Sequence, residues 1–196
     1  MRISIIINPR AGSGAASRQL PLLCRALDAA KVSYDVLTTT CRGDGARLAQ
    51  QARDDGATLI AVVGGDGTLS EVSQAYIGDS GQAIAGPAVA LLSAGTGGDF
   101  ARMVGARERG NLARAARWLV RGRTRAIDLG VMTLHDRSGA PLRRAFINIA
   151  SVGVSGEVDE RVQNGPKWLG GKAAFLLASL GATLSYRNVP VEVKLD

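Results

Sequence analysis

Short apolar runs alternate along the first part of the chain with stretches in which apolar side chains recur every three or four positions. The runs predict buried strands, because they are short and rich in β-branched residues. The spacing of three or four predicts helices, and Asp44 and Asn111 are expected N-caps of two of them. The predicted strands cover residues 3–7, 34–38, 59–63 and 88–92. One predicted helix ends near residue 30, and three others cover 45–54, 69–76 and 112–120.

This alternation of buried strands and amphipathic helices predicts an α/β fold, a parallel sheet with helices on both faces. In such sheets ligands bind beyond the carboxyl ends of the strands. Glycine-rich turns follow the first, third and fourth predicted strands, at residues 8–14, 64–68 and 95–99. All three turns are therefore expected at the same edge of the sheet.

The pattern changes after residue 125. Strands are predicted at 127–133 and 142–150 around a turn at 136–139, followed by a helix over 171–184 and a strand over 189–195. We expect a nucleotide-binding α/β domain over residues 1–125 and the beginning of a β-rich, sandwich-like second domain over 126–196. This second domain is expected to be incomplete, because a domain rarely ends at an exposed strand.

Charge and composition narrow the function classes. The net charge is +7, and residues 101–125 carry all of it, with eight arginines and only Glu108 as an acid. Such a local basic surface indicates an anionic partner. Two cysteines without metal-binding spacing and a single histidine argue against a disulfide framework and favour a reducing cytoplasm. The longest apolar stretch, 173–186, is interrupted by polar residues and is too short to span a bilayer.

The turn Gly64-Gly65-Asp66-Gly67-Thr68 carries the clearest chemical signal. Adjacent glycines let backbone N–H groups approach phosphate oxygens, and the following helix adds its positive N-terminal end. Asp66 would repel a phosphate directly but suits a Mg²⁺ ion, or its water shell, between the two. A tight strand-to-helix turn capped by Asp66 would have the same sequence, so both interpretations stay open for this turn alone.

The three turns together resemble the diacylglycerol kinase catalytic-domain family, which includes bacterial lipid kinases, diacylglycerol kinases and sphingosine kinases. The matching motifs are Asn8-Pro9 with Gly12, residues 64–72 and residues 94–102, in this order. Residues 127–130 and 146–153 extend the resemblance toward the bacterial lipid kinases. The resemblance covers nearly the whole chain. The Gly-Gly-Asp-Gly motif by itself is not specific, because NAD kinases share it.

The resemblance implies ATP-dependent transfer of the γ-phosphate to a lipid hydroxyl, of diacylglycerol or a related lipid, with ATP and Mg²⁺ as cofactors. Asp66 is the expected catalytic residue and would position phosphate through water-linked Mg²⁺. The family's general base lies further along the chain than residue 196, so no residue here is assigned that role and the chain alone is not expected to be a complete enzyme. The expected nucleotide-binding residues are Asn8, Pro9, Arg10, Ala11, Gly12, Thr39, Gly64, Gly65, Asp66, Gly67, Thr68, Leu69, Ser70, Glu71 and Thr96.

The unassigned general base, two further departures from the family pattern and the motif shared with NAD kinases leave alternatives open. Ser70 and Gly98 stand where family members usually have asparagine. A nucleotide-binding, membrane-associating module without turnover is one alternative, and an NAD kinase-like phosphotransferase is another. The arginines of 102–125 are expected to make a peripheral contact with an anionic membrane surface that holds the lipid. A solvated helix face would show the same spacing of arginines. No nucleic acid is expected, because no recognition motif accompanies the charge; the oligomeric state is left open.

Overall fold

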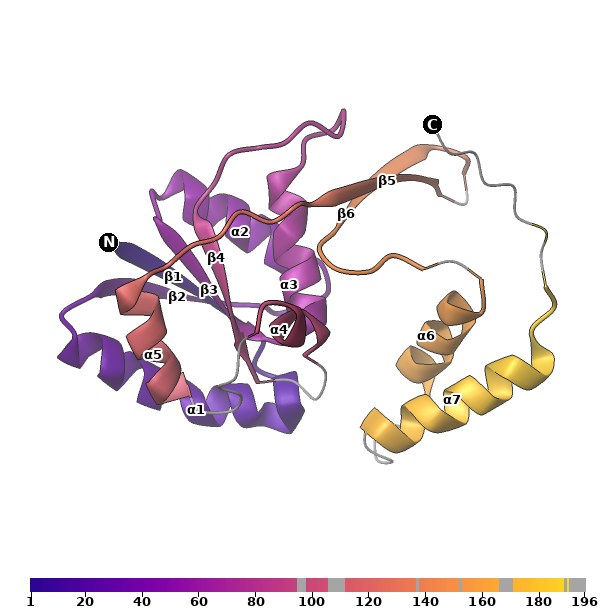
Figure 1. The fold of residues 1–196 in the computed structure, drawn as a ribbon, viewed down its shortest axis with the longest axis horizontal. Coiled ribbons are helices and arrows are strands. Elements are labelled where there is room, and N and C mark those ends of the chain that lie inside the picture. Colours follow the sequence, from indigo (N-terminus) through magenta and orange to yellow (C-terminus); the bar gives the residue numbers. More distant parts are fainter. Residues whose placement is uncertain are drawn as a thin grey trace. The chain divides into compact units, whose positions relative to one another are not determined.

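The computed structural model describes residues 1–94, 98–105, 112–136, 138–151, 153–165, 171–188 and 190. Four parallel strands form one sheet in the order β2-β1-β3-β4. Figure 1 shows the helices of the first unit on both sides of this sheet. Its elements are β1 (Arg2–Ile7), α1 (Ala11–Ala29), β2 (Ser33–Thr38), α2 (Asp44–Asp54), β3 (Leu59–Gly64), α3 (Asp66–Ser73), η1 (Gln74–Tyr76), β4 (Ala88–Ser93), α4 (Asp99–Met103) and α5 (Leu112–Arg121).

The two faces of the sheet bury two separate apolar cores because successive strand side chains point in opposite directions. Ile3, Ile5 and Ile7 of β1 pack with residues of α1 and α5. Ile6 of the same strand packs on the opposite face with residues of α2 and α3. The predicted α/β fold, with a parallel sheet covered on both faces, is thereby confirmed, and each of the four predicted strands agrees with the structure within one residue.

The chain divides into two compact units, Met1–Asn148 and Ile149–Asp196. The first unit also contains an antiparallel hairpin of β5 (Gly130–His135) and β6 (Pro141–Phe146). The described part of the second unit contains α6 (Val154–Asn164) and α7 (Gly171–Ser185), which pack through Val158, Ala178 and Ala182. The expected domain border after residue 125 stays a prediction.

Several local predictions were wrong. The hairpin strands begin or end several residues away from the predicted 127–133 and 142–150, because most hairpin side chains are exposed and their apolar pattern is weak. Gly43, not Asp44, occupies the N-cap position of α2, and the Asp44 carboxylate binds the preceding loop. Helices α4 and α6 were not predicted. The Asn111 cap and nearly all of the strand predicted at 189–195 lie outside the described residues.

Candidate functional site

The candidate site lies at the point where the chain reverses its direction of travel across the sheet. Strand β2 lies on one side of β1 and β3 on the other, so the connections that follow β1 and β3 leave the sheet in opposite directions. A crevice at such a switch point is the usual ligand position in open α/β sheets. The Asn8 backbone N–H bonds to the Val63 carbonyl at 3.0 Å and fixes the first loop beside the end of β3.

The loop after β1 turns through the left-handed region at three successive positions. Gly12, Ser13 and Gly14 have φ angles of 58°, 55° and 82°, which interrupt the start of α1. A Cβ on Gly12 would overlap the carbonyl oxygen of Ala94, at the end of β4. Glycine at position 12 therefore satisfies both the backbone angle and the close approach of two loops.

The second loop is fastened to the first by polar side chains. The Thr68 hydroxyl lies 3.4 Å from Asn8 Nδ2 and above Gly64, where a Cβ would come within 2.6 Å of the Thr68 oxygen. Thr68 is buried, whereas Gly67 is exposed and has open space around its α-carbon. The turn therefore has no side chain at its exposed position, Gly67, and the contact with Asn8 holds the Thr68 hydroxyl in place.

The N-terminus of α3 carries no side-chain cap. Its N-cap residue, Gly65, is extended and makes no side-chain cap hydrogen bond. The first amides of a helix have no partner within the helix and lie at the positive end of its dipole. These features fit a phosphate group, which backbone N–H groups at such a terminus bind well.

The Asp66 carboxylate points to the third loop. One oxygen accepts hydrogen bonds from the backbone N–H of Gly98 at 2.8 Å and of Asp99 at 3.1 Å, and the other lies 3.4 Å from the Phe100 nitrogen. The Asp66 side chain thus accepts hydrogen bonds from the N–H groups at the start of α4, although Asp66 precedes Gly98 by 32 residues. The α3 turn and the α4 turn are held together by this side chain.

Among the described residues, no three His, Cys, Asp or Glu side chains gather closely enough to hold a metal. Asp66 is bound to backbone N–H groups, and the Glu71 carboxylate accepts the Gly45 N–H at 3.1 Å. These side chains do not fit a site in which protein carboxylates hold Mg²⁺ directly. The expected link from Asp66 to Mg²⁺ through water stays a prediction.

The loop after β2 reaches the same edge of the sheet. The Thr39 N–H donates to the Ile7 carbonyl at 2.9 Å, which places Thr39 beside the start of the first loop. The Asp44 carboxylate organises this segment, with hydrogen bonds from the Thr40 hydroxyl at 2.6 Å, the Thr40 N–H at 2.7 Å and the Cys41 N–H at 3.1 Å. These bonds, the Thr40 hydroxyl first, hold the pKa of Asp44 far below its ordinary value. Sequence reasoning missed this role of Asp44, although Thr40 four positions earlier was a usable signal.

The other expected site residues have mixed positions. Pro9, Arg10 and Ala11 continue the first loop, where the Arg10 N–H donates to Asn8 Oδ1 and the Pro9 carbonyl accepts from Ser17. Leu69 is buried in the core beneath α3 and does not line the loop edge. The expected site residues that the structure brings together at the loop edge are Asn8, Gly12, Thr39, Gly64, Gly65, Asp66, Gly67 and Thr68. Glu71 instead connects α3 to α2, and Ser70 is exposed on α3. Thr96 lies outside the described residues.

The fold and this cluster of loops define an α/β domain of the lipid-kinase type, as comparison with known proteins shows. Residues 2–132 match the family described as the diacylglycerol kinase catalytic domain. The chain belongs to this family, which agrees with the resemblance in its three loop motifs.

Two curated relatives and one solved structure illustrate the similarity. The chain is 29% identical over 195 residues to a diacylglycerol kinase of Bacillus subtilis, covering 100% of this chain and 60% of the relative. It is 29% identical over 176 residues to the lipid kinase YegS of Escherichia coli, covering 90% of this chain and 54% of the relative. A crystal structure of a diacylglycerol kinase from Bacillus anthracis has 27% identity and a TM-score of 0.52, covering 67% of this chain and 46% of that one. The chain therefore spans little more than half the length of these curated relatives.

Proposed function

We propose that this chain is the nucleotide-binding part of an ATP-dependent lipid kinase that transfers the γ-phosphate of ATP to a lipid hydroxyl, with diacylglycerol as the first candidate acceptor. The observation that supports this most is the uncapped N-terminus of α3 at the switch point between β1 and β3. Membership in the diacylglycerol kinase catalytic domain family supports kinase chemistry in general.

The nucleotide phosphates would bind at the turn between β3 and α3. Gly65 and Gly67 bring no side chain there, so the backbone amides of the first turn of α3 can reach phosphate oxygens. The Thr68 hydroxyl, 3.4 Å from Asn8 Nδ2, lies behind these amides and can donate one further hydrogen bond. Phosphoryl transfer needs mainly orientation and stabilisation of charge, which a rigid set of backbone donors supplies.

The first and third loops would form the sides of the nucleotide site. Gly12 lies against Ala94, so the first loop is in contact with the end of β4. Asp66 holds the start of α4 beside the phosphate turn through Gly98 and Asp99. In this arrangement Asp66 acts by positioning the third loop, and no described residue is assigned the role of general base.

A lipid acceptor is favoured because the relatives are named diacylglycerol kinase and lipid kinase. No helix among the described residues is both long enough and apolar enough to cross a bilayer. In this proposal the kinase reaches the lipid hydroxyl from a membrane surface.

The test is transfer of labelled γ-phosphate from ATP by the native protein that contains this chain. Diacylglycerol in mixed detergent micelles is the first acceptor, with sphingosine and NAD as competing acceptors. A phosphorylated lipid is the expected product. ATP binding without transfer to any acceptor would instead support a binding module without turnover, and transfer to NAD would support the NAD kinase-like alternative.

A further inference from the structure

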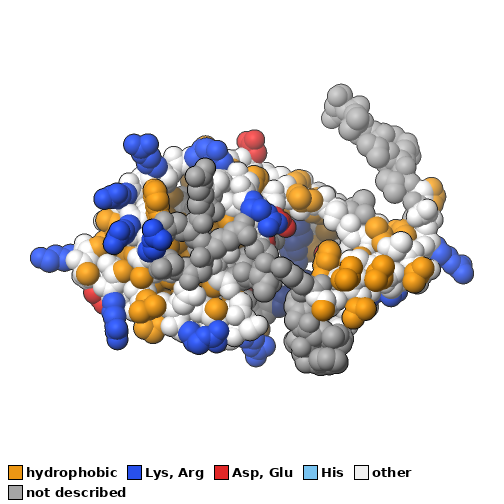
Figure 2. Space-filling view, turned by 60° about the horizontal axis from the view of Figure 1, so that its bottom comes forward, with side chains coloured by type: hydrophobic (Ala, Val, Ile, Leu, Met, Phe, Trp, Pro, Cys, Tyr) orange, Lys and Arg blue, Asp and Glu red, His pale blue; other side chains and the backbone are white. Residues whose placement is uncertain are grey.

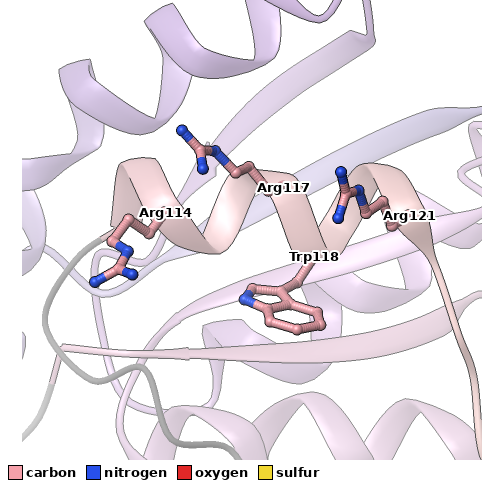
Figure 3. A pocket seen from close by; sticks show the side chains of 4 residues that line it. All are labelled: Arg114, Arg117, Trp118 and Arg121. Atoms are coloured by element: carbon pink, nitrogen blue, oxygen red, sulfur yellow. The ribbon is translucent and has the colours of Figure 1, made fainter.

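Helix α5 presents an unusual surface that the nucleotide site does not use. Its buried side consists of Leu112, Ala115, Ala116 and Leu119, which pack into the core with α1. The opposite side carries Arg114, Arg117, Trp118 and Arg121, at spacings that place them on one exposed stripe. Figure 3 shows the guanidinium groups of Arg117 and Arg121 extending to one side of the Trp118 ring, with Arg114 nearer the start of α5.

Trp118 is the strongest indication that this stripe contacts something. Its side chain is 65% exposed, and Val120 beside it is 39% exposed. Tryptophan carries a large apolar area, and an exposed apolar patch rimmed by charged residues is typical of an interaction site. Tryptophan is also favoured at membrane interfaces, where its ring contacts acyl chains and its N–H stays hydrated.

An apolar groove runs beside the same stripe, between the end of α1 and α5. It has a volume of about 430 Å³. Its lining consists mainly of small apolar side chains, with Arg117 and Arg121 as the charged members. The lining residues are Ala26, Ala29, Ala30, Ala113, Ala116, Val120, Arg117 and Arg121.

The charge of this surface selects its partner. The sequence of α5 from 112 to 121 contains three arginines and no acid. Among the described residues, neither Arg117 nor Arg121 takes part in an ion pair. Figure 2 shows Lys and Arg side chains spread over the face of the first unit, with few acidic side chains among them. Such a surface complements an anionic one.

We propose that the stripe of Arg114, Arg117, Trp118 and Arg121, with the groove beside it, docks the protein on a bilayer that contains anionic phospholipid. The arginines would pair with headgroup phosphates, while Trp118 enters the interface and the groove accepts apolar groups from the lipid. This inference rests on the proposed function, because a kinase that acts on a membrane lipid needs such a contact. It adds the residues that would make it.

The experiment is sedimentation of the native protein with phosphatidylcholine vesicles that contain or lack phosphatidylglycerol, without nucleotide. Binding to the anionic vesicles is expected to fall about 30-fold in the double variant Arg117→Gln/Arg121→Gln, since each basic side chain near an acidic membrane contributes about a factor of five. The control variant Arg144→Gln/Arg187→Gln removes the same charge from two exposed positions outside α5 and is expected to bind nearly as the parent protein does. Equal losses in both variants would overturn the proposal.

A second measurement follows Trp118 itself. The 196 residues contain two tryptophans, Trp118 and Trp168, and comparison with a Trp118→Phe variant isolates the contribution of Trp118 to the emission of the native protein. Its fluorescence is expected to shift to shorter wavelength on anionic vesicles and not on duplex DNA at the same salt concentration. Transfer of phosphate to a short-chain, water-soluble diacylglycerol is expected to be unchanged in the Arg117→Gln/Arg121→Gln variant. If the Arg117→Gln/Arg121→Gln variant loses vesicle binding but transfers phosphate to the soluble diacylglycerol normally, both proposals are supported. Normal vesicle binding by this variant would overturn docking through α5. Absence of phosphate transfer by the parent protein would overturn the proposed kinase activity alone. A shift on DNA only would identify a different anionic partner and overturn the membrane proposal.

Discussion

The carboxylate of Asp66 accepts a hydrogen bond from the backbone N–H of Gly98 at 2.8 Å, across 32 positions of sequence. This bond joins the first turn of α3 to the start of α4. It also explains why an acidic residue can stand in a turn that fits phosphate: the charge is directed at backbone donors of a neighbouring helix and not at the proposed phosphate position.

Replacing Asp66 with asparagine is expected to lower phosphate transfer by the native protein about 10- to 100-fold while the fold is kept. The amide retains one acceptor but loses the charge and the second oxygen, and hydrogen bonds to a charged group contribute about 1.5–3 kcal/mol. Transfer kinetics and the melting temperature measure the two effects separately. The matched control is Asp99→Asn, whose exposed carboxylate pairs with Arg102. Full turnover in Asp66→Asn would remove this residue from the mechanism.

Gly12→Ala is expected to destabilise the protein and to weaken ATP binding together. Alanine at φ 58° costs about 1 kcal/mol in backbone strain, and its Cβ would overlap the Ala94 carbonyl oxygen, so the loops must separate. Gly56→Ala is the control, because Gly56 has φ 79° but open space around it, and it lies outside the loop cluster. Denaturant unfolding and nucleotide titration of both variants decide the matter. If Gly56→Ala lost as much stability as Gly12→Ala, the close loop contact would not matter.

Gly67→Ala separates stability from nucleotide binding. Gly67 lies in the first turn of α3 with nothing near its α-carbon, so alanine is expected to leave the free energy of unfolding unchanged or raise it by up to about 1 kcal/mol. The added methyl group stands where phosphate is proposed to approach, and ATP affinity is expected to fall about tenfold, which is about 1.4 kcal/mol. Gly156→Ala in α6 is a helical glycine with equally open surroundings and serves as the control. Unchanged ATP affinity in Gly67→Ala would argue against phosphate at this turn.

The strands of the sheet could be predicted from sequence because their signal is local. Ile3, Ile5, Ile6 and Ile7 are almost fully buried, and a short run of such residues has few other solutions. The hairpin was less predictable, because Leu134 is 40% exposed and so gives no clear inward face.

The candidate site was predictable as three loops at one edge, but its internal contacts were not. Asp66 finds its partners at residues 98–100, and Glu71 finds Gly45, so both carboxylates depend on how distant segments pack. No local pattern distinguishes such a carboxylate from one that faces a ligand. Leu69 shows the opposite case: it belongs to a family motif, yet its side chain serves the core.

Gln74, the first residue of η1 after α3, connects this part of the chain to the hairpin. Its side-chain amide donates to the Ala145 carbonyl and accepts the Ala145 N–H, both at 2.9 Å, as a neighbouring strand would. Gln74→Ala is expected to lower the free energy of unfolding by about 1–3 kcal/mol, because two backbone groups of β6 lose their partner. Gln51→Ala, at an exposed position of α2, is the control and is expected to change stability by less than about 0.5 kcal/mol. Thermal unfolding compares the two, and equal effects would refute the role of Gln74.

The loop that carries Thr39 is expected to weaken in acid, because its organiser is the Asp44 carboxylate. The Thr40 hydroxyl and the Thr40 and Cys41 N–H groups lower the pKa of Asp44, so the folded state binds this proton less readily than the unfolded chain does. Its stabilising contribution is therefore complete above the ordinary value near pH 4 and is lost as the pH falls below it.

The difference in unfolding free energy between the parent protein and Asp44→Asn should consequently be constant near neutral pH and shrink below about pH 4. Thr40→Val tests the cause, because it removes the hydroxyl donor and leaves the backbone N–H in place. Carboxyl titration followed by nuclear magnetic resonance should show the pKa of Asp44 part of the way back to its ordinary value in that variant. If the pKa of Asp44 were the same in Thr40→Val as in the parent protein, the backbone donors alone would hold the carboxylate. The conformation of the loop around Thr39 would then depend on those backbone hydrogen bonds.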